Sequence, residues 1–164
     1  MIAYGDYIRE TKRLLGSYNK MKVAALNLTE EIEETERFLE DEGIAAMRYG
    51  DDRISGGSGE LTATEAAAAR RIRMEGWIAQ LRARRDALER TVRAMDRALE
   101  SLHDADAELI RGRYMQGLSW AQVAERLNYT EKWAQEKGGR VLCDVALMLF
   151  GVTVRPAQLN LPLY

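Results

Sequence analysis

Six polar residues between positions 130 and 140 have side chains that can bind the edges of DNA bases. Glutamine, lysine and glutamate each have a hydrogen-bonding partner among the base edges exposed in the major groove. On a helix that begins after Thr130, these side chains and Lys137 are expected to point outward near the N-terminal end. The candidate DNA contacts are Thr130, Glu131, Lys132, Gln135, Glu136 and Arg140, and the candidate contacts to the DNA backbone are Arg111 and Arg113.

Two short turns are predicted on either side of a helix that precedes the one from Thr130. This earlier helix would support the later one, which we call the reading helix. Gly117 is suited to leaving one helix and changing direction, and Ser119 with Gln122 can form a capping box for the next. Residues 128–129 make the second turn, after which Thr130 can cap the following helix. The supporting helix has one apolar face, formed by Trp120, Val123, Ala124 and Leu127. This spacing predicts a helix-turn-helix, and the alternative is a plain three-helix packing unit with solvated charges.

The same stretch resembles region 4 of sigma-70 factors over the sequence LIRGRYMQGLSWAQVAERLNYTEKW and the GGRVL that follows it. It is closer still to the small phage transcriptional regulators of the ArpU/RinA type, in which such a helix-turn-helix follows a long helical N-terminal half. The resemblance is specific over residues 109–142 and architectural over residues 1–103. It implies that the helix from Thr130 reads promoter DNA, that RNA polymerase is a further partner, and that the protein activates phage genes in the host cell cytoplasm.

The charge of this module is balanced, with six basic and six acidic residues between positions 104 and 142. A module that binds DNA alone ordinarily carries excess positive charge, so we expect another segment, another copy or a partner to contribute. Residues 70–97 hold nine arginines and four acidic residues. From this segment, the candidates for tracking phosphates are Arg82, Arg84 and Arg85. Residues 30–42 hold eight acidic side chains and one arginine, so the alternative is that these opposite charges pair with each other.

Two apolar seams predict long helices in the N-terminal part of the chain. The first runs from Tyr7 to Leu39 at alternating spacings of four and three residues, and the second runs from Ile78 to Leu102. A connector rich in glycine and aspartate lies between them. Similar helix lengths and a flexible connector favour an antiparallel hairpin, although the same seams could instead join two chains as a homodimer.

These patterns together predict an all-α fold. Residues 1–103 are expected to form a long antiparallel coiled-coil hairpin with a loop near 43–61. Residues 104–151 are expected to form a three-helix, sigma-region-4-like helix-turn-helix, and residues 152–164 an irregular C-terminal tail.

Chemistry of other kinds has little support in this sequence. His103 is the only histidine and Cys143 the only cysteine, so a catalytic triad or zinc site lacks its partners. We expect His103 at the C-terminal end of a helix and Cys143 in an apolar core. The phosphate-binding patterns GxxxxGK[ST] and GxGxxG after a strand, and the CxxC pattern, are missing, so neither an enzyme nor a bound cofactor or metal is expected. No apolar run approaches about 18 residues, which predicts a cytoplasmic protein without a membrane partner.

Two other functions fit the same features. A phage small terminase subunit also combines a helix-turn-helix with coiled-coil oligomerisation, and would recognise packaging-site DNA as a ring of many copies. A protein-interaction adaptor would keep the helix-turn-helix shape without binding DNA, which the balanced charge of residues 104–142 favours. Our preferred expectation is sequence-specific regulation of transcription through double-stranded DNA.

Overall fold

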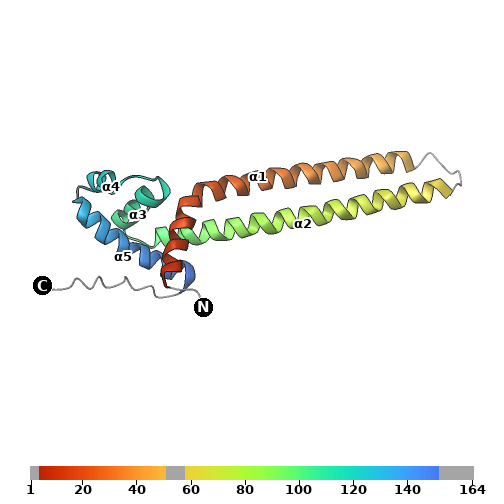
Figure 1. Cartoon of the computed structure of the whole chain (residues 1–164). Helices are drawn as coiled ribbons and strands as arrows, with labels where there is room; N and C mark the ends of the chain where they lie inside the picture. The colour runs from red at the N-terminus through yellow and green to blue at the C-terminus, as the bar shows by residue number, and fades with distance from the viewer. Residues whose placement is uncertain (1–3, 51–57, 152–164) are drawn as a thin grey trace. The chain divides into compact units, whose positions relative to one another are not determined.

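The computed structural model describes residues 4–50 and 58–151, and the regular elements in these ranges are helices (Figure 1). The prediction of an all-α fold is therefore confirmed for this part of the chain. Along the described residues, no helix is both long enough and apolar enough to cross a bilayer. The elements are α1 (Tyr4–Gly50), α2 (Ser58–Glu100), α3 (Asp104–Ile110), the π-helical turn η1 (Arg111–Met115), α4 (Trp120–Leu127) and α5 (Glu131–Phe150).

The connector between the long helices differs from the predicted loop near 43–61. Helix α1 continues to Gly50 and α2 already begins at Ser58, so most of that stretch is helical. The prediction ended the first helix too early, near Gly43. A single glycine lowers helix stability by only about 1 kcal/mol, and the good helix formers that follow Gly43 allow α1 to continue. Residues 51–57 and the tail predicted at 152–164 lie outside the described residues.

The chain divides into two compact units, and the division does not coincide with the predicted boundary at residue 103. The terminal unit comprises Met1–Met21 and Arg90–Tyr164, and the two-helix unit comprises Lys22–Glu89. Both long helices contribute to both units. The difference arises because the beginning of α1 and the end of α2 share an apolar core with α3, α4 and α5.

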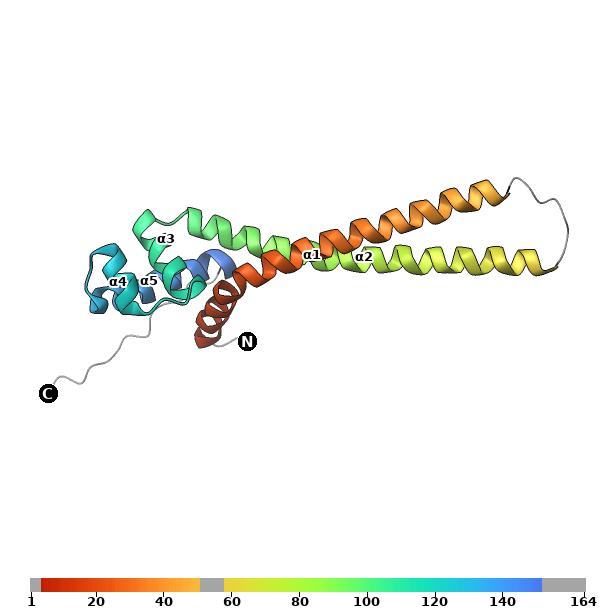
Figure 2. The ribbon, with the colours of Figure 1, turned by 90° about the horizontal axis from the view of Figure 1, so that it is seen from above.

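In the two-helix unit, α1 and α2 lie side by side and run antiparallel (Figures 1 and 2). Residues late in α1 contact residues early in α2, as in the ion pair between Glu42 and Arg70 at 2.9 Å. Glu36 and Arg82 form a second ion pair between the two helices. The apolar contact between the helices is made by Ile32, Leu39, Ile78 and Leu81, with Leu28 and Met74 beside them.

The core of the terminal unit fixes the position of α5. One face of α5 is buried along its length because the residues on it recur at spacings of four and three: Ala134, Gly138, Val141 and Val145. They meet apolar side chains from every other helix of the unit. The members of this core with no more than 3% exposure include Leu15, Met95, Leu99, Leu109, Ile110 and Val123.

Candidate nucleic-acid interface

Helix α4 is held at both ends by the local signals that the sequence predicts. At its start, the Ser119 backbone N–H donates to Oε1 of Gln122 at 2.8 Å, and the Gln122 N–H donates to Oγ of Ser119 at 3.2 Å. Gly117 before it has a φ of 73°, and Asn128 after it adopts the left-handed conformation with a φ of 56°. The predicted turns and capping box are confirmed, and they limit α4 to eight residues.

The start of α5 is fixed in two ways. Oγ1 of Thr130 accepts a hydrogen bond from the Trp133 backbone N–H at 3.2 Å, which confirms the predicted cap. The rings of Tyr129 and Trp133 are stacked, with centroids 3.8 Å apart and an interplanar angle of 20°. A capped and stacked first turn is less prone to fraying, so side chains projecting from it keep a defined direction.

Helix α5 packs closely on α4 through the indole of Trp120. The ring of Tyr114 meets this indole edge-on, with centroids 6.1 Å apart. The indole also lies against the backbone of α5 at Gly138, where there is no room for a side chain. The adjacent Gly139 faces open space. Close approach therefore accounts for the first of the paired glycines.

The first three turns of α5 present a polar, exposed face. The capping residue Thr130, just before the helix, is exposed as well. Within the face, Nε2 of Gln135 donates a hydrogen bond to Oε1 of Glu131 at 3.0 Å. Here the structure brings together the candidate DNA contacts predicted from the sequence. The exposed residues on this part of the helix are Glu131, Lys132, Gln135, Glu136, Gly139 and Arg140.

Three further basic residues of this region have other positions. Lys137 points toward α3, where its Nζ lies 3.0 Å from Oδ2 of the nearly buried Asp106, so the prediction that it points outward is wrong. The guanidinium of Arg113 donates to the Leu118 carbonyl at 2.8 Å and lies 5.1 Å from the centroid of the Trp120 ring. Arg111 is exposed and borders a cleft of about 320 Å³ between α3, η1 and α4, and no residue of α5 is among the residues lining that cleft.

An open groove of about 610 Å³ lies along the exposed face of α5. Helix α1 forms its other side with Ile8 and Lys12, and Trp120 contributes from α4. The residues of α5 that line the groove include Gln135, Glu136 and Arg140. Sequence reasoning did not identify Ile8 or Lys12, because no local signal connects them with residues more than 120 positions later.

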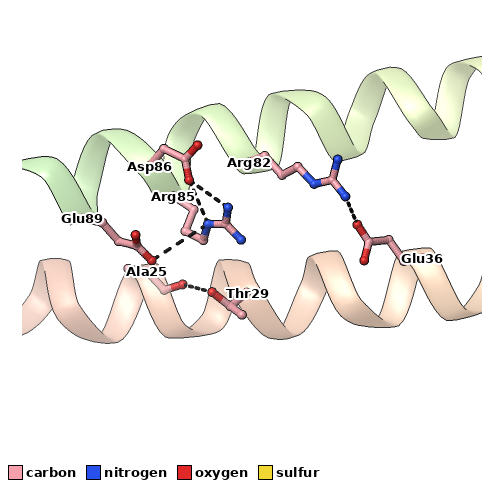
Figure 3. A network of polar contacts seen from close by, with 7 residues as sticks. All are labelled: Ala25, Thr29, Glu36, Arg82, Arg85, Asp86 and Glu89. Atoms are coloured by element: carbon pink, nitrogen blue, oxygen red, sulfur yellow. Dashed lines mark hydrogen bonds and ion pairs between the residues drawn. The ribbon is translucent and has the colours of Figure 1, made fainter.

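The arginines predicted to track phosphates contact neighbouring side chains of the two-helix unit. Arg82 of α2 forms an ion pair with Glu36 of α1, and Nη2 of Arg85 lies 2.8 Å from Oδ1 of Asp86 (Figure 3). The hydrogen bond to Asp86 also raises the pKa of Arg85. These contacts favour the alternative interpretation, in which opposite charges pair within the helical pair.

Arg84 contacts an aromatic ring instead of a carboxylate. Its guanidinium carbon lies 5.7 Å from the centroid of the Trp77 ring. Trp77 is 42% exposed, so it is a surface residue of α2 and not the core anchor that its size suggests. The contact occupies one face of the indole and holds the arginine close to the helix.

The remaining titratable residues singled out from the sequence have structural positions. Cys143 is buried as predicted, and burial raises the pKa of its thiol. His103 is not at a helix C-terminus, because α2 ends at Glu100 and His103 is the residue that precedes α3. No family model, curated protein or solved structure matches this chain. A functional proposal therefore depends on the residues and geometry described above.

Proposed function

We propose that this protein is a sequence-specific DNA-binding regulator of transcription. In this proposal α4 and α5 form a helix-turn-helix, and the N-terminal half of α5 reads base edges in the major groove. The observation that carries it is the exposed polar face of α5, which runs from Glu131 to Arg140 on a helix whose opposite face is buried. The major groove is about 12 Å wide and admits one α-helix that presents such side chains at its N-terminal end.

The chemistry of this face suggests a role for each side chain. Gln135 can form two hydrogen bonds with adenine, and its present contact with Glu131 is a solvent-exposed bond that DNA can replace. Lys132 and Arg140 can donate to guanine or to phosphate, and Glu131 and Glu136 can accept from the amino group of cytosine. The hydroxyl of Thr130 accepts from the helix N-terminus and still has its own hydrogen to donate to a phosphate.

The resemblance to phage regulators of the ArpU/RinA type extends the proposal to a setting. It implies promoter DNA of phage genes as the target, RNA polymerase as a second partner and activation as the outcome, and we include these in the proposal. We propose a coiled-coil hairpin for residues 1–103, preceding a sigma-region-4-like module. If the chain forms a homodimer, its two reading helices would bind half-sites about 34 Å apart or a multiple of that distance.

Selection of bound fragments from a random duplex library tests this proposal. The wild-type chain is expected to enrich a consensus sequence, and Gln135→Ala or Lys132→Ala is expected to change that consensus at one or two positions. Asp144→Ala is a matched control, because Asp144 is an exposed residue of the same helix outside the proposed reading face. Absence of any enriched sequence with the wild-type chain would overturn the proposal.

A protein-interaction adaptor is the second candidate, and one observation favours it. Three of the six cations in residues 104–142 contact groups of the same chain: Lys137 contacts Asp106, Arg113 the Leu118 carbonyl, and Arg126 the side chain of Gln116. An adaptor would fail to shift any phage-derived duplex at low salt and would capture RNA polymerase. The mass in solution tests the third function, because a small terminase subunit would assemble into a ring of many copies.

A further inference from the structure

We infer that the N-terminal part of α1 forms a second wall of the DNA interface, and that Lys12 contacts the phosphate backbone there. This inference rests on the proposed function, because it assumes that α5 enters the major groove. It adds to that function an element from the opposite end of the chain and a cation outside the helix-turn-helix.

The burial pattern of α5 shows where α1 lies relative to the exposed face. Gly139, Cys143 and Ala146 follow each other at spacings of four and three residues, so they share one side of the helix. Gly139 is exposed, whereas Cys143 and Ala146 are buried in a cluster with Tyr7 and Ile8 of α1. Helix α1 therefore covers the C-terminal half of the side whose N-terminal half is open.

This arrangement defines where a duplex can approach α5. Because α1 covers this side of α5 from Cys143 onward, DNA that contacts the exposed residues of α5 up to Arg140 must lie next to α1. The groove between the two helices is lined by Lys12 on one side and Arg140 on the other. Its volume of about 610 Å³ lies within the range of sites that bind small organic groups, so a sugar-phosphate segment can fit.

The charges around the groove are suited to an anion. Within the described parts of the chain, Lys12, Lys132 and Arg140 form no ion pair, whereas Arg9 and Arg13 on α1 pair with Asp6 and Glu10. Glu136 is the acidic residue that lines the groove. The two cations that line the groove, Lys12 and Arg140, outnumber its one carboxylate, Glu136. This excess of positive charge favours a polyanion over a neutral or basic protein surface.

The salt dependence of DNA affinity tests this inference with the full-length chain. Each phosphate contact contributes about 0.9 to the slope of log affinity against log salt concentration. We therefore expect Lys12→Gln to make the slope shallower by about 0.9 and to weaken the selected and a scrambled duplex by the same factor. Lys12→Arg keeps the charge and should restore the wild-type slope. Lys20→Gln is the matched control, since Lys20 is an exposed lysine of α1 that does not line the groove.

The outcomes of this experiment distinguish a failure of the inference alone from a failure of the proposed function. If Gln135→Ala changes the consensus while Lys12→Gln leaves the slope unchanged, α5 reads DNA without α1, and the groove is left to a protein partner. If the wild-type chain binds no duplex at low salt, both the DNA-binding proposal and the role of Lys12 are wrong. A shallower slope with Lys12→Gln alone supports a composite interface.

Discussion

The indole of Trp120 occupies the space that a side chain at Gly138 would need. A Cβ atom at position 138 would lie 2.5 Å from Cη2 of Trp120 and 3.1 Å from Cδ2 of Leu109. Contacts of this kind join α4, α3 and α5 in one place, so the direction of the exposed face of α5 depends on this glycine. Its neighbour Gly139 has no atom within 4 Å of the corresponding position.

The paired glycines provide a first prediction because they differ only in packing. Gly138→Ala is expected to destabilise the fold by up to about 2 kcal/mol, since overpacking a core costs about 1–3 kcal/mol and alanine recovers about 1 kcal/mol of helix propensity. Gly139→Ala is expected to stabilise it by up to about 1 kcal/mol. Urea unfolding of both variants measures the difference. Equal effects at the two positions would show that Trp120 moves aside freely.

The cap of α5 gives a second prediction. Thr130→Ala removes the acceptor for the Trp133 N–H and should lower the free energy of unfolding by about 1 kcal/mol. Thr130→Ser keeps a hydroxyl at the same position and is expected to retain most of the stability. Thermal unfolding followed by circular dichroism compares the three proteins. The cap contributes nothing if the alanine variant unfolds at the wild-type temperature.

A third prediction concerns the tyrosine that joins α1 to α2 in the terminal unit. Tyr18 donates a hydrogen bond to Oδ1 of Asp96 at 2.5 Å, and this bond raises the pKa of the phenol from 10.0 to about 12. A raised pKa means that the folded state favours the protonated phenol. The resulting stability is fully present below about pH 10 and is lost as the pH rises toward about 12.

Tyr18→Phe isolates this effect. The wild-type free energy of unfolding should fall more steeply than that of the variant between about pH 10 and about pH 12, because phenylalanine has no proton to lose. Denaturant unfolding at a series of pH values measures both curves. Parallel curves would mean that the Asp96 hydrogen bond does not persist in solution.

The arginines of the two-helix unit give a fourth prediction. The alanine substitution of Arg82, Arg84 and Arg85 together is expected to leave the salt dependence of DNA affinity unchanged, because Arg82 and Arg85 pair with carboxylates and Arg84 contacts Trp77. The alternative, that these arginines track phosphates, predicts a slope shallower by about 0.9 for each contact. Filter binding at several salt concentrations distinguishes the two.

A double-mutant cycle on the exposed pair Arg82–Glu36 measures what the pairing contributes to stability. We expect a coupling energy of about 0.2–1 kcal/mol, the usual range for solvent-exposed ion pairs. A value near zero would show that the two side chains are solvated independently.

Much of the local structure could be predicted from the sequence, because its causes act over four residues or fewer. The capping box of Ser119 and Gln122, the turn at Gly117 and the cap at Thr130 depend on side chains that bond to nearby backbone groups. Helical spacing also predicted the exposed face of α5, since outward and inward positions follow from 3.6 residues per turn. These local features are sufficient to locate the candidate site in the sequence.

Only the tertiary structure shows which residues from distant parts of the chain contact one another. Lys137 lies at the flank of α5, and only the position of Asp106 on α3 makes it an inward-facing ion pair. Gly138 and Gly139 cannot be distinguished by residue type, but Gly138 packs against the indole of Trp120 and Gly139 faces solvent. The proximity of Lys12 to Arg140 depends on how α1 crosses α5. Such contacts join residues far apart in the chain, and they arise from packing of apolar faces that many arrangements could satisfy, so only the folded chain selects among them.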